Sequence, residues 1–279
     1  QGSLVDGSTQ SKFEVSPVEK ILAYSRHSDV YLFDYEKQRD VIVLPGRGGV
    51  VDAITFFASG EYLAVDGHIW NVNERKSINE MDNVPWQLSS ISELNALAFG
   101  FNDTVVIYDI YTKEEVLRIK TPSGGGHIGQ VCFTSDGKRG YSLSEDFYLS
   151  YFDVATGQVT ASFHAYKKYK VHVNKIILDE RSGRLYGIAM GYKGFAVSIF
   201  DLEKGKLIKT TNRSLPVPKE RDPNAGMNIL DAVLSPDGKT LAISGEDCQI
   251  LLLDIETLKT KGILGEGCSV APFKRRTIV

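Results

Sequence analysis

Short runs of alternating apolar and polar residues, separated by turn residues, follow one another along the whole chain. The clearest series lies in residues 126–158, GHIGQVCFTSDGKRGYSLSEDFYLSYFDVATGQ. Its extended runs are 130–134, 140–144 and 147–153, and a fourth follows at 159–163. Between the first two runs, Asp and Gly supply turn chemistry, because Asp accepts local backbone hydrogen bonds and Gly adopts positive φ. The series predicts four short antiparallel strands in one small sheet.

The same unit recurs along the chain, and the acidic or amide residue that ends its third run marks each copy. The markers are Asp34, Asn71, Asp109, Asp153, Asp201 and Asp254. They are 37, 38, 44, 48 and 53 residues apart. Repeats of about 40–45 residues with four strands each are typical of a β-propeller. We therefore predict an all-β fold, a β-propeller of four-stranded antiparallel blades with six recognisable repeats.

A repeat architecture accounts for the length of 279 residues without an internal domain boundary. We predict a single β-propeller domain over residues 12–279, preceded by an arm at 1–11. We interpret the first three residues of this arm, Gln-Gly-Ser, as the remnant of an affinity tag. Residues 268–279 are too short for a blade. A closed ring avoids unpaired strand edges. We therefore expect residues 268–279, together with 1–11, to form an irregular last blade, which favours a seven-bladed ring over a six-bladed ring.

Two stretches carry a motif pattern that identifies a family resemblance. The first contains Gly126-His127, the turn 133–137 (FTSDG) and Phe152-Asp153, and the second contains the turn 235–238 (SPDG) and Leu253-Asp254. This pattern resembles the Gly-His…Ser-Pro-Asp-Gly…Trp-Asp pattern of WD-repeat proteins, at low stringency over most of the chain. The resemblance implies the propeller fold, and it does not imply one particular function.

In WD-repeat proteins, a His, a Ser, a turn Asp and a strand Trp form a hydrogen-bonded tetrad that braces each blade. The resemblance therefore implies a set of structural tetrad candidates. They are His127, Ser142, Ser144, Asp146, Ser244 and Asp247. Phe152 stands where the family has Trp, and the gap between His127 and Phe133 is shorter than in the family pattern.

Composition narrows the classes of partner. The net charge is −3, with 32 basic and 35 acidic residues, whereas a nucleic-acid-binding protein would usually have a basic face. No apolar run approaches the ~18 residues of a membrane span. We therefore expect neither nucleic acid nor a membrane span. Oligomeric state stays open, and so does the compartment: the protein is cytoplasmic, or exported if a signal peptide was removed. Three cysteines favour unpaired thiols, although Cys248 and Cys268 could form a disulfide.

Loop lengths predict which end of the propeller binds a partner. Turns between the first and second strands, and between the third and fourth, are tight and open at one end. The connections between blades are longer and open at the other end, where loops on a rigid scaffold often carry binding residues. We take the basic and aromatic residues there as binding-face candidates, with solvated connectors as the alternative. They are His127, Tyr166, Lys167, Lys168, Tyr169, Lys170, Arg213, Lys219 and Arg221.

No pattern of residues in this sequence indicates a catalytic or metal-binding site, so we assign no catalytic residue, metal or cofactor. The leading hypothesis is a non-enzymatic scaffold for protein–protein interaction, which binds a protein or peptide through the long inter-blade loops. The alternative is a propeller enzyme or redox accessory subunit, such as a lactonase-like hydrolase or a dehydrogenase subunit. Such a protein would bind a small ligand or metal at the channel mouth, an analogy that rests on the fold alone.

Overall fold

The structure is a computed structural model, and it describes most of the chain between residues 12 and 265. Outside the described residues lie 1–11, 46–50, 52, 58–59, 81–87, 92–93, 95, 123–125, 147, 165–170, 192–193, 214–228, 246–249 and 266–279. The chain divides into two compact units, Gln1–Lys167 and Lys168–Val279, which are described separately below. That residues 12–279 form one domain stays a prediction.

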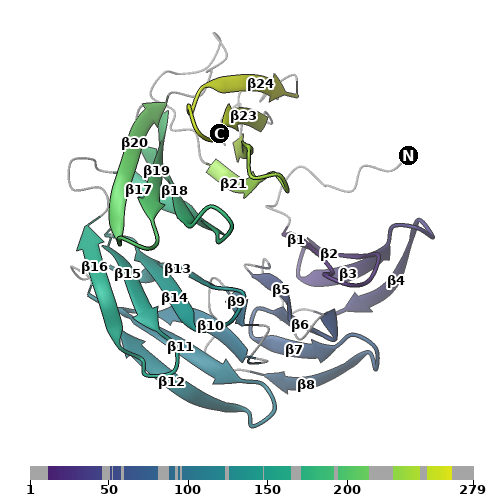
Figure 1. The fold of residues 1–279 in the computed structure, drawn as a ribbon. Coiled ribbons are helices and arrows are strands. Elements are labelled where there is room, and N and C mark those ends of the chain that lie inside the picture. Colours follow the sequence, from purple (N-terminus) through teal and green to yellow (C-terminus); the bar gives the residue numbers. More distant parts are fainter. Residues whose placement is uncertain are drawn as a thin grey trace, which may run out of the picture. The chain divides into compact units, whose positions relative to one another are not determined.

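The first unit holds four sheets, each of four consecutive strands, which we call blades 1–4 (Figure 1). Blade 1 consists of β1 (Phe13–Val15), β2 (Ile21–Arg26), β3 (Asp29–Asp34) and β4 (Arg39–Leu44). Blade 2 consists of β5 (Ile54–Phe57), β6 (Tyr62–Val65), β7 (His68–Asn71) and β8 (Lys76–Glu80). Blade 3 consists of β9 (Leu88–Ile91), β10 (Ala96–Phe101), β11 (Thr104–Asp109) and β12 (Glu114–Lys120). Blade 4 consists of β13 (Ile128–Phe133), β14 (Arg139–Ser144), β15 (Tyr148–Asp153) and β16 (Val159–His164).

The second unit holds two further sheets of the same kind, blades 5 and 6. Blade 5 consists of β17 (Val171–Asp179), β18 (Arg184–Gly191), β19 (Gly194–Asp201) and β20 (Lys206–Arg213). Blade 6 consists of β21 (Ile229–Leu234), β22 (Thr240–Gly245), β23 (Ile250–Asp254) and β24 (Thr260–Leu264). Neighbouring strands pair antiparallel in every blade, as the turn pattern predicted.

The second strand of blade 2, β6, is apolar throughout because it is buried on both faces. In β6, Leu63 and Val65 pack against blade 1, whereas Tyr62 and Ala64, which point the other way, pack against blade 3. Phe152 of blade 4 likewise joins a cluster made mostly of blade 3 residues. Blades 5 and 6 share a similar core in the second unit. Each sheet therefore needs a neighbouring sheet to cover its apolar faces.

Successive blades also meet along their first strands. In the first unit β1 contacts β5, β5 contacts β9, and β9 contacts β13, and in the second unit β17 contacts β21. Blades 3 and 4 approach closely at Gly100, where an added Cβ would lie 2.2 Å from the backbone oxygen of Ile128. The backbone N–H of Ile128 donates to the backbone oxygen of Asn102 at 2.7 Å. Glycine at position 100 therefore allows blades 3 and 4 to pack closely.

This arrangement confirms the predicted all-β propeller class, with six four-stranded antiparallel blades. The choice between a six-bladed and a seven-bladed ring stays a prediction, because the two units are described separately. The residues expected to form an irregular seventh blade, 1–11 and 268–279, lie outside the described part of the chain. Within that part there is no helix of the length and apolar character that crossing a membrane requires.

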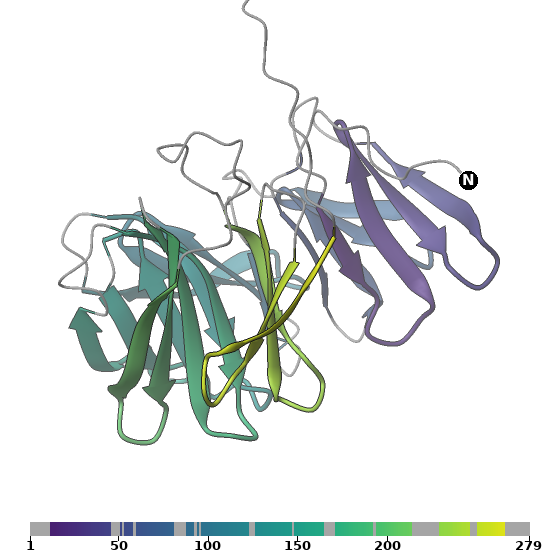
Figure 2. The same cartoon turned by 90° about the horizontal axis from the view of Figure 1, so that it is seen from above.

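Blade 5 differs from the other blades in the length of its strands. Its four strands have nine, eight, eight and eight residues, whereas no strand of blade 6 has more than six. In Figure 2 the green strands of blade 5 are correspondingly long. The added length lies at the end of the sheet where β17 begins and β20 ends, because Phe195 pairs with Arg213 and Val171 pairs with Gly191 there.

Candidate functional site

Each blade has two ends with different chemistry. The turns between the first and second strands and between the third and fourth strands lie together at one end, which we call the turn end. The chain enters and leaves the blade at the opposite end, which also holds the turn between the second and third strands; we call this the connection end. The antiparallel strand order fixes this division in all six blades.

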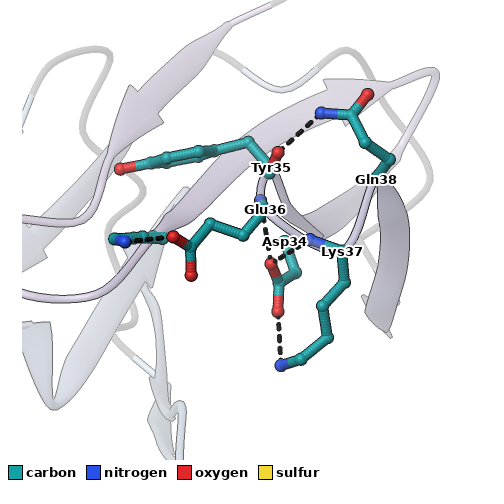
Figure 3. Close-up of polar contacts among 6 residues, drawn as sticks. Asp34, Tyr35, Glu36, Lys37 and Gln38 are labelled. Atoms are coloured by element: carbon teal, nitrogen blue, oxygen red, sulfur yellow. Dashed lines mark hydrogen bonds and ion pairs between the residues drawn. The ribbon is translucent and has the colours of Figure 1, made fainter.

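The acidic or amide residue that marks each repeat caps a hairpin at the turn end. Its side-chain oxygen accepts hydrogen bonds from backbone N–H groups two or three residues later. Asp34 Oδ1 accepts from the N–H of Glu36 at 3.1 Å and of Lys37 at 2.9 Å (Figure 3). In the other blades, the corresponding backbone hydrogen bonds are accepted by the side-chain oxygens of Asn71, Asp109, Asp153, Asp201 and Asp254. The six markers are therefore turn caps, which explains why Asn serves as well as Asp in repeat 2.

A second regularity follows four residues after each cap, where the backbone adopts positive φ. The residues are Gln38, Arg75, Lys113, Gly157, Gly205 and Leu258, with φ between 53° and 69°. In the same hairpin each third and fourth strand shift register by a β-bulge, for example between Leu32 and Phe33. The cap, the left-handed residue and the bulge form one turn unit, which the chain repeats six times.

Electrostatics at the turn end follow from this capping. The pKa of Asp34 is lowered, first by the hydrogen bond from the Lys37 side chain, whose Nζ lies 2.7 Å from Oδ2, and then by the backbone N–H of Lys37. The Thr156 hydroxyl and N–H lower the pKa of Asp153. The Lys204 N–H lowers that of Asp201. These carboxylates are held ionised by bonds inside their own turns, a structural role rather than a catalytic one.

The first turns of blades 4 and 6 are built in the same self-contained way. The hydroxyl of Ser235 donates to Asp237 Oδ1 at 2.6 Å, and the N–H of Lys239 donates to the same oxygen at 3.0 Å. Thr134 and Asp136 form the equivalent pair in blade 4 at 2.7 Å. The polar groups in the described turns of this end are thus engaged mainly with one another.

The predicted tetrad residues of blade 4 lie at its connection end, and two of them are bonded. The hydroxyl of Ser144 donates to Asp146 Oδ1 at 2.5 Å, and Gly126 lies so close that a Cβ there would be 2.8 Å from that oxygen. Ser142 is fully buried, and neither its hydroxyl nor Asp146 Oδ2 has a hydrogen-bond partner within the described part of the chain. His127 is exposed, and its backbone oxygen accepts from the N–H of Glu145 at 2.8 Å.

Blade 6 uses its corresponding serine differently. The Ser244 hydroxyl donates to the backbone oxygen of Asp231 at 3.2 Å and accepts from the N–H of Asp231 at 3.1 Å. It therefore bridges β21 and β22. Asp247 lies outside the described residues, so its bond to Ser244 stays a prediction. The tetrad role as a whole also stays a prediction.

The binding-face candidates belong to the connection ends of blades 4 to 6. His127 immediately precedes β13, and Arg213 is the last residue of β20. Tyr166, Lys167, Lys168, Tyr169, Lys170, Lys219 and Arg221 lie outside the described residues. In the second unit an ion pair between Lys175 Nζ and Asp231 Oδ1, at 2.7 Å, joins the first strands of blades 5 and 6 near this end. The sequence pattern does not predict this ion pair, because it does not align the two strands.

Within the described part of the chain, no group of three or more His, Cys, Asp or Glu residues is placed so that it could bind a metal ion. Cys132 is half-buried in β13. Cys248 and Cys268 lie outside the described residues.

Comparison with known proteins assigns no family to this chain. No family model matches it, and no curated protein is significantly similar to it.

Proposed function

We propose that this protein is a non-enzymatic scaffold for protein–protein interaction, built on a degenerate WD-repeat-like propeller. It binds a protein or peptide segment through the connection end of its blades. The binding candidates there are the exposed His127, the end of β20 at Arg213, and the inter-blade segments 165–170 and 214–228.

One observation carries this proposal: the two ends of the blades differ in regularity. At the turn end the same cap, left-handed residue and bulge recur in all six blades, and their polar groups bond to their own turns. At the connection end the strands extend to different lengths, and the segment between β20 and β21 spans residues 214–228. A repeated, internally satisfied end has little free chemistry for a partner, whereas a varied end on a rigid scaffold is suited to recognition.

The test is site-specific photo-crosslinking in an extract of the source organism. A photoreactive amino acid replaces His127 or Arg213 at the connection end, or Gln38 or Lys204 at the turn end. We expect one partner protein to crosslink from positions 127 and 213 and not from 38 and 204. Crosslinking of that partner from the turn-end positions alone would show that the wrong end was chosen.

Segment replacement provides an independent control. Replacing 214–228 and 165–170 with Gly-Ser segments of equal length removes their side chains and keeps their reach. The matched variant, Lys37→Ala with Lys204→Ala, alters two exposed charges at the turn end. Partner recovery should fall at least tenfold in the first variant and stay unchanged in the second. Unchanged recovery in the segment variant would contradict the proposal.

A further inference from the structure

The outer edge of blade 5 differs from the outer edge of every other blade. β20 is an edge strand, because the sheet order is β17-β18-β19-β20. It is also the longest of the fourth strands, with eight residues, whereas β12 has seven and β24 has five. An edge strand leaves every second backbone N–H and C=O group without a ladder partner on its outer side.

Most of the length of β20 is regular. The bulge in this hairpin lies between Ile199 and Phe200, so that Leu207 and Lys209 pair across it and Ile208 is the extra residue. From Lys209 to Arg213 the pairing with β19 continues without a shift. In β24 the corresponding regular stretch covers only Gly262 to Leu264. A bulge prevents another strand from pairing alongside it, so the usable edge begins beyond it.

The charge on β20 has one sign. The strand KLIKTTNR contains Lys206, Lys209 and Arg213 and no acidic residue. By contrast, β12 contains Glu114 and Glu115 as well as basic residues. Lysines on an edge strand hinder pairing with a second copy of the same edge, because like charges would lie side by side. The same lysines favour an added strand that carries carboxylates.

Apolar side chains are exposed beside these charges. Ile208 is 54% exposed and Leu207 is 40% exposed. Lys206 is exposed, whereas Lys209 is half-buried and its Nζ lies near the backbone oxygens of Glu256 and Thr257, at 3.5 and 3.4 Å. The edge therefore offers main-chain hydrogen bonds, basic groups and some aliphatic surface to an incoming chain.

We propose that β20 is a docking edge for an acidic peptide in extended conformation, which pairs with Lys209–Arg213 as a fifth strand of blade 5. This site lies on the side of the blade and shares only Arg213 with the connection end, and it operates whether or not the connection end binds the partner proposed above. A second copy of this chain is disfavoured as the occupant, since its own β20 carries the same positive charge.

The experiment uses the full chain and three labelled, end-capped heptapeptides, with binding followed by fluorescence anisotropy. The first alternates Glu and Val, the second has its central Val replaced by Pro, and the third alternates Lys and Val. Proline removes a backbone donor and disfavours strand pairing. We expect the Glu/Val peptide to bind at least tenfold more tightly than the other two. Equal binding of the proline peptide would refute strand addition, because charge attraction alone would then explain the affinity.

The matched protein variants are K206E/K209E on β20 and K76E/K120E on β8 and β12. Both reverse two positive charges on outer strands, and far-UV circular dichroism checks their folding. Binding of the Glu/Val peptide should fall at least tenfold in the first variant and less than twofold in the second. Equal losses would show a net-charge effect and overturn the proposal.

Amide hydrogen exchange locates the bound peptide on the wild-type protein. We expect slower exchange in residues 209–213 when the Glu/Val peptide is bound, and no change in β12 or β24. Protection elsewhere, with none in β20, would contradict the proposal. Neither Lys206 nor Lys209 belongs to the connection end, so K206E/K209E should leave crosslinking from positions 127 and 213 intact. A failure of the docking proposal for β20 can thereby be distinguished from a failure of the proposed function.

Discussion

The ring of Phe152 lies directly over Gly140, its partner across β14 and β15. A Cβ added to Gly140 would come within 2.1 Å of the ring, and within 2.9 Å of Phe133. Phe133 and Phe152 meet edge to face, with their centroids 5.9 Å apart. The glycine thus creates the slot in which the ring of Phe152 packs.

Replacing this glycine should destabilise blade 4. In Gly140→Ala the methyl group overlaps the Phe152 ring, so the ring or the strand must shift, at a cost of roughly 1–3 kcal/mol. The measurement is the free energy of unfolding from chemical denaturation. Gly262→Ala in β24 is the matched control, because nothing lies within 4 Å of its added Cβ. If both variants were equally stable, the close approach of ring and glycine would be wrong.

At the left-handed position of the turn unit, a substitution by glycine should raise the stability of the protein. Arg75 has φ of 57°, a conformation that glycine adopts more easily than residues with a Cβ. Arg75→Gly should therefore raise stability, by roughly 0.5–1 kcal/mol. Lys76→Gly, one residue later at the start of β8, should lower it, because glycine weakens a strand. Thermal unfolding of the two variants checks the sign, and a loss of stability in Arg75→Gly would contradict the turn geometry.

Acid should unfold the protein partly through the turn caps. Capping lowers the pKa of Asp34, Asp153, Asp201 and Asp254 below the unfolded value near 3.8. Their contribution to stability is therefore present above about pH 4 and is lost as the pH falls through the lower folded-state pKa values. Asp153→Asn keeps an acceptor oxygen, as Asn71 does, but cannot titrate. We expect a smaller loss of stability between pH 6 and pH 3 in this variant; an unchanged loss would count against the capping account.

High pH should destabilise the folded protein through Tyr24 of blade 1. Burial, and then the hydrogen bond from its hydroxyl to Asp40 Oδ1 at 3.0 Å, raise the pKa of Tyr24 from 10.0 to about 12. Between these values the folded protein retains a proton that the unfolded chain releases, so stability falls as pH rises from 10 to 12. Tyr24→Phe should reduce this alkaline loss, measured by denaturation at pH 9 and pH 11. An equal loss in both proteins would show that Tyr24 is not the responsible group.

The sequence predicted the repeat and the strands because each blade is a local structure. Strand order, antiparallel pairing and tight turns follow from neighbouring residues, and the spacing of Asp34, Asn71 and their equivalents marked every blade. That these residues cap hairpins, with a left-handed residue four positions later, was not predicted. Gln38, Arg75, Lys113 and Leu258 have no common side-chain type, so only the backbone reveals the shared conformation.

Other features depend on contacts between segments, which the sequence pattern does not encode. The inter-blade connection predicted after blade 5 included Arg213, because residues such as Asn212 and Arg213 favour neither strand nor loop. The pairing of Phe195 with Arg213 shows that they continue the ladder. The ion pair between Lys175 and Asp231 likewise requires blades 5 and 6 to be packed together.

We propose above that this propeller recognises a partner at the connection end of its blades. The most direct measurement is amide hydrogen exchange of the full chain, alone and with the partner recovered by crosslinking. We expect slower exchange in the inter-blade segments 121–127, 165–170 and 214–228, and no change in the capped turns 35–38, 154–158 and 202–205. Protection of the capped turns, with the inter-blade segments unaffected, would contradict it.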